Sequence, residues 1–177
     1  MVIIAALLLF QGAAEAWTHS HSGTHPRSKR APPQAFTAVV THVTDGDTIW
    51  VSVGGGVQAI DVRLQGIDAP EICQDYGGVA AGALLQHLQH QTVSVTGRAR
   101  DKYGRMVAKV SLNGQDVGAW LVENGHAWSY HNKRSLGPYG KQETAARQAG
   151  HGLWASSSPI EPKLFRKRTK CYKPSHK

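Results

Sequence analysis

Cysteines, charged residues and long apolar runs are all scarce in this chain of 177 residues. Its two cysteines exclude both a disulfide-stapled scaffold and a zinc module built from several thiolates. The apolar run over residues 2–10 is far shorter than the roughly 20 residues that span a bilayer. Only 18% of the residues are charged, yet Lys and Arg outnumber Asp and Glu by 20 to 12. The net charge of +8 indicates a polyanionic partner, either nucleic acid or an acidic membrane surface.

The first 35 residues lack the alternating or helical apolar pattern of a folded domain. Residues 1–16 join the apolar run to a small-x-small ending at 14–16, which is typical of a secretory signal, although no Lys or Arg precedes the run. We predict a cleaved export signal here and therefore a periplasmic or secreted protein; without such a signal the protein would be cytoplasmic. Residues 17–35 are rich in His, Ser, Pro and basic residues, so we expect a flexible arm.

Five β-branched segments, separated by turn-forming residues, predict five strands over 36–43, 47–53, 57–67, 92–98 and 105–112. Three helices are expected over 77–90, 116–124 and 139–150, the first with Val79, Ala83, Leu84 and Leu88 on its apolar stripe. This order favours a small closed barrel over a βαβ fold. We predict an α+β, mainly β, fold over 36–158: a five-stranded OB-type barrel with about three helices. A basic tail without periodicity follows over 159–177.

Acidic residues are concentrated at two turns, DGDT at 45–48 and DAPE at 68–71. The proline of the second turn fixes its own φ and keeps the preceding residue extended, so the two acids that flank it are held rigidly. Oxygen ligands from Asp47, Asp68 and a nearby carbonyl suit Ca²⁺ or Mg²⁺, while Glu71 would stay free as a base. Taken alone, each stretch is equally consistent with an ordinary turn.

Two arginines, Arg63 and Arg105, stand at or near strand ends, from which side chains can converge on one mouth of a barrel. Two guanidinium groups near a cation and a carboxylate base would stabilise the doubly charged transition state of phosphodiester cleavage. A single arginine is better explained as the partner of a surface acid. Explaining the arginines and the acids separately requires five coincidences, so we favour phosphodiester chemistry.

With these motifs the chain resembles the staphylococcal-nuclease (thermonuclease) family of calcium-dependent secreted nucleases. The resemblance runs from about Phe36 to Trp154 and rests on DGDT (45–48), RLQGIDAPE (63–71) and DKYGR (101–105) together. It implies cleavage of DNA and RNA at the P–O5′ bond with little sequence preference, by endo- or exonucleolytic action, leaving 3′-phosphate ends. We expect a plasmid-borne member associated with a partition locus, acting as a monomer.

The resemblance also implies a role for each residue of these motifs. A calcium ion would be held by Asp47, Asp68 and the main-chain carbonyl of Ala69, with Asp45 supporting these ligands from behind. The other roles are general base for Glu71, phosphate clamping for Arg63 and Arg105, and nucleotide contacts for Lys102 and Tyr103. The chain departs from the family's pattern around 128–133, where Tyr130 or His131 would make the remaining nucleotide contact.

Cys73 lies two residues after Glu71, and Cys171 lies in the basic tail. If the chain is exported, a disulfide between them would pin the tail beside the active-site loop. The alternative is a buried Cys73 with a free thiol in the tail.

A non-catalytic OB-type module that only binds nucleic acid is the rival interpretation. The complete set of Asp47, Arg63, Asp68, Glu71 and Arg105 favours the enzyme, because a binding module does not need these residues together. Membrane binding is disfavoured, because Pro174 and irregular apolar spacing do not make an amphipathic helix of the tail.

Overall fold

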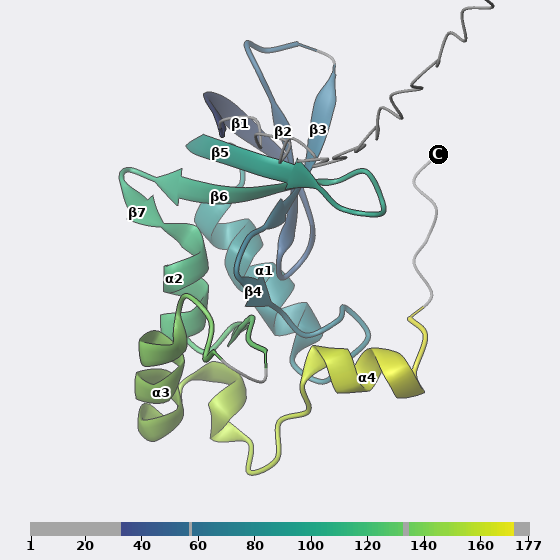
Figure 1. Ribbon diagram of the computed structural model, residues 1–177, viewed down its shortest axis with the longest axis vertical. Helices are drawn as coiled ribbons and strands as arrows, with labels where there is room; N and C mark the ends of the chain where they lie inside the picture. Colours follow the sequence, from purple (N-terminus) through teal and green to yellow (C-terminus); the bar gives the residue numbers. More distant parts are fainter. Residues whose placement is uncertain (1–32, 57, 133–134, 172–177) are drawn as a thin grey trace, which may run out of the picture. The chain divides into compact units, whose positions relative to one another are not determined.

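Five strands of the computed structural model close into a barrel. The structure describes residues 33–171, apart from 57 and 133–134. The barrel strands are β1 (Gln34–Asp45), β2 (Thr48–Ser52), β3 (Ala59–Leu64), β5 (Thr92–Arg100) and β6 (Met106–Leu112). They are hydrogen-bonded in the order β3-β2-β1-β5-β6, and a parallel pairing of β3 with β6 closes the ring (Figure 1). The predicted OB-type barrel is confirmed.

Three short strands extend this core. β7 (Gln115–Asp116) pairs with the end of β6, whereas β4 (Ile67–Asp68) and β8 (Trp128–Ser129) form a separate two-stranded sheet. The antiparallel pairing places Asp68 opposite Trp128. The residues after β3 are therefore fixed in place by hydrogen bonds at the point where the acidic turn begins.

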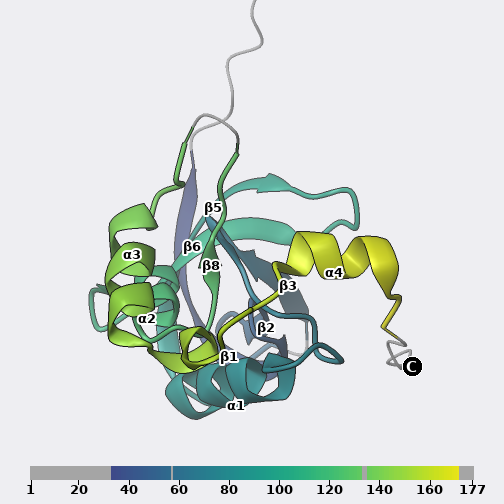
Figure 2. The same cartoon turned by 90° about the horizontal axis from the view of Figure 1, so that it is seen from below.

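The helices α1 (Gly77–Leu88), α2 (Val117–Glu123) and α3 (Gly140–Ala149) lie where the sequence predicts them. A 3₁₀ turn, η1 (Gly152–Ala155), follows α3, and a fourth helix, α4 (Pro162–Arg168), lies in the predicted tail. Proline at the first helical position starts α4, and seven residues are too short to show an apolar period. In both views α4 lies on the opposite side of the barrel from α2 and α3 (Figures 1 and 2).

The apolar core fills the barrel and the space under α1. Its fully buried side chains come from the strands and from the inner faces of α1 and α2: Val40, Ile49, Val51, Val62, Val93, Val95, Leu84, Leu88, Val117 and Leu121. The predicted stripe on α1 is wrong at Val79, whose side chain is 56% exposed; Ala80 faces the core instead. A smaller cluster of Trp128, Ala146, Leu153 and Trp154 packs α3 and η1 against β8.

Several predictions concern parts of the chain outside the described residues. The predicted signal over 1–16 lies there, as do residues 17–32 of the predicted arm and the last six residues of the tail. Strand β1 begins at Gln34, within the last residues assigned to the arm. Among the helices that the structure describes, none has the length and apolar character needed to cross a membrane.

Candidate active site

The turn between β1 and β2 packs tightly against the loop that follows β4. A Cβ atom at Gly46 would lie 2.8 Å from the Cβ of Ala69, so only glycine permits this approach. The main-chain N–H of Ala69 donates to Oδ2 of Asp47 at 3.0 Å, and the N–H of Asp47 donates to Oδ1 of Asp45 at 3.2 Å. The two acidic turns that lie apart in the sequence are therefore joined in the structure.

Arg63 on β3 links the carboxylates of these two turns. The antiparallel pairing of β2 with β3 places Arg63 opposite Thr48. Its guanidinium donates to Oδ1 of Asp47 and, at 3.0 Å, to Oδ1 of Asp68. The hydroxyl of Thr48 donates a further hydrogen bond to Asp47 at 3.1 Å. The predicted convergence of Asp47, Arg63 and Asp68 is thus present in the structure.

The carboxylates of this cluster are buried, so keeping them charged costs free energy. Asp45, Asp47 and Asp68 are only 7%, 3% and 5% exposed. Burial raises the pKa of Asp47 to about 7, against the opposing effect of Arg63 and with a further contribution from the charge of Asp45. Burial lowers the pKa of Arg63, but Asp47 and Asp68 more than offset this and hold it above its ordinary value. Arg63 alone therefore leaves an excess of buried negative charge among three carboxylates.

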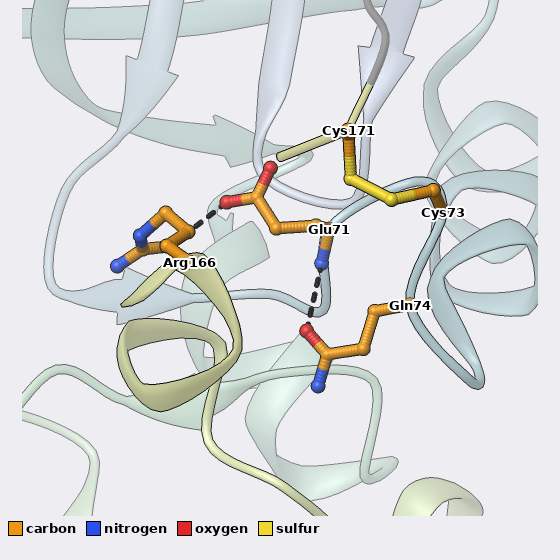
Figure 3. The surroundings of a disulfide bond; sticks show 5 residues. All are labelled: Glu71, Cys73, Gln74, Arg166 and Cys171. Atoms are coloured by element: carbon orange, nitrogen blue, oxygen red, sulfur yellow. Dashed lines mark hydrogen bonds and ion pairs between the residues drawn. A yellow bond between two sulfur atoms is a disulfide. The ribbon is translucent and has the colours of Figure 1, made fainter. Parts of the chain in front are cut away.

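Glu71 lies at the edge of the cluster, in a loop where Gln74 contacts its main chain (Figure 3). A Cβ atom at Gly77 would lie 1.9 Å from the carbonyl oxygen of Glu71, so the start of α1 supports this loop directly. The N–H of Glu71 donates to Oε1 of the buried Gln74 at 3.2 Å. Nε2 of Gln74 in turn donates to the carbonyl of Ile160 at 2.6 Å, which ties the loop to the chain just before α4.

Arg105, in the turn just before β6, reaches the cluster through Thr48. Its guanidinium donates to Oδ2 of Asp101 at 2.8 Å and to Oγ1 of Thr48 at 3.3 Å. The ring of Tyr103, 71% exposed, lies 5.4 Å from this guanidinium and 4.9 Å from the ammonium of Lys102. An exposed aromatic ring and two cations are thus gathered beside the carboxylates.

Tyr130 and His131 follow β8, and the main-chain N–H of Tyr130 donates to the carbonyl of Gly66. Tyr130 is exposed, and Nε2 of His131 lies 3.7 Å from a carboxylate oxygen of Glu161. Within the part of the chain that the structure describes, no hydrogen bond or ion pair joins either residue to Asp68 or Glu71. Their nucleotide contact stays a prediction.

The C-terminal segment enters the site, as the predicted Cys73–Cys171 disulfide implied, but the sequence interpretation missed the contacts that Arg166 makes there. A disulfide joins Cys73 to Cys171, and Arg166 of α4 makes a hydrogen bond to Glu71 (Figure 3). Arg166 also makes hydrogen bonds to Asp68. A signal was available, because a bridge from Cys171 to a residue two positions after Glu71 brings residue 166 near that carboxylate. The role of Gln74 had no comparable signal in the sequence.

Oxygen donors suited to a hard cation are present, but they do not form a closed cage. Among the described residues no group of three or more acidic, histidine or cysteine side chains is arranged to hold a metal ion. Asp47 and Asp68 supply two buried carboxylates, whose oxygens fit a divalent cation completed by carbonyl and water oxygens.

Comparisons with known proteins agree with this geometry. Residues 61–156 match the family described as "Staphylococcal nuclease homologue". An "Uncharacterized endonuclease" of Escherichia coli O157:H7 is 37% identical over 130 residues, covering 73% of this chain and 84% of that protein. A protein of the same description from Haemophilus influenzae is 33% identical, over 76% of this chain and 75% of its own length. "Staphylococcal-like nuclease CAN1" of Arabidopsis thaliana is 38% identical over 60% of this chain and 33% of its own length.

Proposed function

Because this chain belongs to the staphylococcal nuclease family and is a nuclease, we propose that it is a calcium-dependent phosphodiesterase acting on DNA and RNA. It cleaves with little sequence preference, endo- or exonucleolytically, and leaves 3′-phosphate ends. The observation that carries the proposal is the buried pair Asp47 and Asp68, joined by Arg63 and flanked by Glu71.

The chain's own residues divide the work of cleavage. Asp47, Asp68 and the carbonyl of Ala69 would hold the calcium ion, and Asp45 orients Asp47 through its main-chain N–H. When bound, the ion supplies positive charge that polarises the phosphodiester and offsets the charge it gains. Glu71 takes a proton from the attacking water as the new P–O bond forms and the P–O5′ bond breaks. The departing 5′-oxygen takes up a proton from solvent and leaves as a 5′-hydroxyl.

Arg63 and Arg105 stabilise the charge that develops on the phosphate oxygens. Both are held beside Asp47, Arg63 directly and Arg105 through Thr48, so their positions are fixed before substrate arrives. Tyr103, exposed next to Arg105, offers a face on which a base stacks. Lys102 adds a cation on the same side, so one strand of nucleic acid would pass over this turn.

Export is the second part of the proposal. A Cys73–Cys171 disulfide persists in oxidising compartments, so it supports a periplasmic or secreted protein whose signal over 1–16 is removed. N-terminal sequencing of protein purified from the periplasm or medium tests this, with residue 17 expected first. A monomer and a plasmid link stay predictions.

Replacing the base tests the reaction. Glu71→Gln keeps the size of the side chain but cannot accept the proton, so we expect turnover to fall by about 100- to 10,000-fold. Plasmid and single-stranded DNA are incubated with Ca²⁺ or with EDTA, and DNA binding is measured separately. Glu123→Gln, an exposed glutamate at the end of α2, is the matched control and keeps full activity.

Each result has a separate meaning. If Glu71→Gln cleaves as fast as the wild type, the assignment of the base is wrong. If the wild type is equally active in EDTA, the assignment of the cation is wrong. Loss of DNA binding together with turnover would mean that Glu71 positions substrate instead.

A further inference from the structure

Arg166 makes three hydrogen bonds to two carboxylates of the proposed active site. Its guanidinium donates to Oδ1 of Asp68 at 3.0 Å and to Oδ2 of the same residue at 2.9 Å. It also donates to Oε1 of Glu71 at 2.9 Å (Figure 3). One cationic side chain therefore holds a proposed calcium ligand and the proposed base at once.

These contacts use the oxygens that a cation would need. Oδ1 of Asp68 accepts hydrogen bonds from both Arg63 and Arg166, and Oδ2 accepts one from Arg166. A divalent cation coordinated by Asp68 would carry the same sign of charge as Arg166 and share its acceptor atoms. The guanidinium and the cation therefore compete for Asp68.

Of the two arginines on Asp68, Arg166 is the one that can leave. Its side chain is 41% exposed, whereas that of Arg63 is 22% exposed and extends from a barrel strand. In α4 only Pro162 is buried, so the seven-residue helix has little apolar packing of its own. The segment is held instead by the disulfide and by the hydrogen bond from Gln74 to Ile160.

We propose that Arg166 is a built-in competitor of the divalent cation at Asp68, and that the Cys73–Cys171 disulfide sets its strength. The inference rests on the calcium site of the proposed function. Cation binding displaces Arg166 from Asp68 and, because the same guanidinium holds Glu71, frees the base in the same step. The enzyme is then restrained at low calcium and released as calcium rises.

The disulfide acts through effective concentration. A tether five residues from Arg166 keeps the guanidinium near Asp68 even when it dissociates. A dithiol reductant breaks the S–S bond, leaves thiols at both cysteines and is itself oxidised to a disulfide. Arg166 then competes less well, and calcium binds more tightly.

Calcium titration without nucleic acid tests the proposal directly. Isothermal calorimetry on full-length oxidised protein compares the wild type with Arg166→Gln and with Lys167→Gln. We expect Arg166→Gln to lower the dissociation constant for calcium about tenfold, within the usual range of coupling between sites. Lys167→Gln removes the same charge from an exposed neighbour on α4 and changes the constant less than about twofold, because exposed charges are screened.

Two further measurements test displacement and the tether. Amide hydrogen exchange over 162–168 becomes faster when calcium is added to the wild type, and is already fast in Arg166→Gln. The double variant Cys73→Ser/Cys171→Ser binds calcium more tightly than the wild type but less tightly than Arg166→Gln. Treating the wild type with dithiothreitol gives the same shift as the double variant.

The outcomes separate this inference from the proposed function. Equal or weaker calcium binding by Arg166→Gln, with binding by the wild type intact, overturns the competition and leaves the calcium site standing. If Arg166→Gln binds calcium and the wild type does not, the result supports the competition. If neither protein binds calcium, the calcium site itself is wrong and the competition falls with it.

Discussion

The folded domain and the C-terminal segment use charge in opposite ways. Residues 36–162 contain 10 Lys and Arg against 11 Asp and Glu, whereas residues 163–177 contain seven Lys and Arg and no acid. The barrel's Arg63 and Arg105 are paired with carboxylates, while Lys163, Lys167, Arg168 and Lys170 are exposed. The basicity of the whole chain is therefore carried by its ends, and the domain directs its few cations at one site.

Arg166 breaks this division. It belongs to the basic segment by sequence, yet it is the second arginine on Asp68. A segment that only held nucleic acid would not need to reach the carboxylates. The affinity for nucleic acid proposed for the basic segment and the chemistry proposed for the domain are thus linked through α4 and its disulfide. Variants in the segment and variants in the domain can both test this link.

The largest effect is expected from removing the covalent link between the two regions. Cys73 and Cys171 are 98 residues apart, so Cys73→Ser/Cys171→Ser is expected to lower the free energy of unfolding by about 4 kcal/mol in the chain-entropy description. Urea unfolding followed by tryptophan fluorescence measures this. Wild-type protein kept in dithiothreitol is the control and loses the same amount. An unchanged unfolding midpoint in both, or two free thiols by mass spectrometry of exported protein, would contradict the bridge.

An intermediate effect concerns the buried charge of the barrel. The pKa of Asp47 lies above its ordinary value, so its stabilising contribution is complete below about pH 4 and is lost as the pH rises through about 7. In EDTA the free energy of unfolding of the wild type therefore falls between these limits. Asp47→Asn, whose amide oxygen still faces Arg63, lacks this decrease.

Urea unfolding at several pH values compares the two proteins, and their difference removes the contribution of the other acids. If Arg63 instead outweighs burial, the wild type gains stability relative to Asp47→Asn as the pH rises. The sign of the difference therefore decides between the two effects.

The smallest effect is expected from the exposed cations of the basic segment. Lys167→Gln/Arg168→Gln/Lys170→Gln is expected to make the slope of log affinity against log salt shallower by up to about 3, at about 0.9 for each phosphate contact to duplex DNA. Binding is measured in EDTA with Glu71→Gln in the background, so that DNA stays intact. Lys141→Gln, exposed on α3, is the control and leaves the slope unchanged. An unchanged slope in the triple variant would mean that the segment does not contact phosphate.

Much of the fold was predictable because its signals are local. Alternation of apolar residues and the turns between them located all five barrel strands, and helical periodicity located α1, α2 and α3. The face of α1 was less certain, since Val79 and Ala80 are adjacent and only packing against β1 decides which is buried. Helix α4 showed no apolar periodicity, because it has only seven residues, and Pro162 was its one local signal.

The candidate site divides in the same way. The acids and arginines were identifiable because their residue types and spacings limit the chemistry, and Gly46 explains why the two acidic turns approach each other. Tyr130 and His131 could not be placed, since exposed side chains on a loop have no periodicity that fixes their direction. Arg166 was counted only as one charge among seven, because a charge alone does not specify its partner.

The sequence by itself determined the strands, three helices and the residues capable of phosphodiester chemistry. These signals depend only on side-chain type and on the pattern of residues close together in the chain. Tertiary structure decided which of those residues meet. Arg166 and Asp68 lie 98 residues apart in the sequence. Only closure of the barrel, docking of α4 and the disulfide bring the guanidinium of Arg166 to 3.0 Å from Oδ1 of Asp68. Coulomb attraction has no preferred direction, so the partner of a charge is fixed by the folded backbone that carries it.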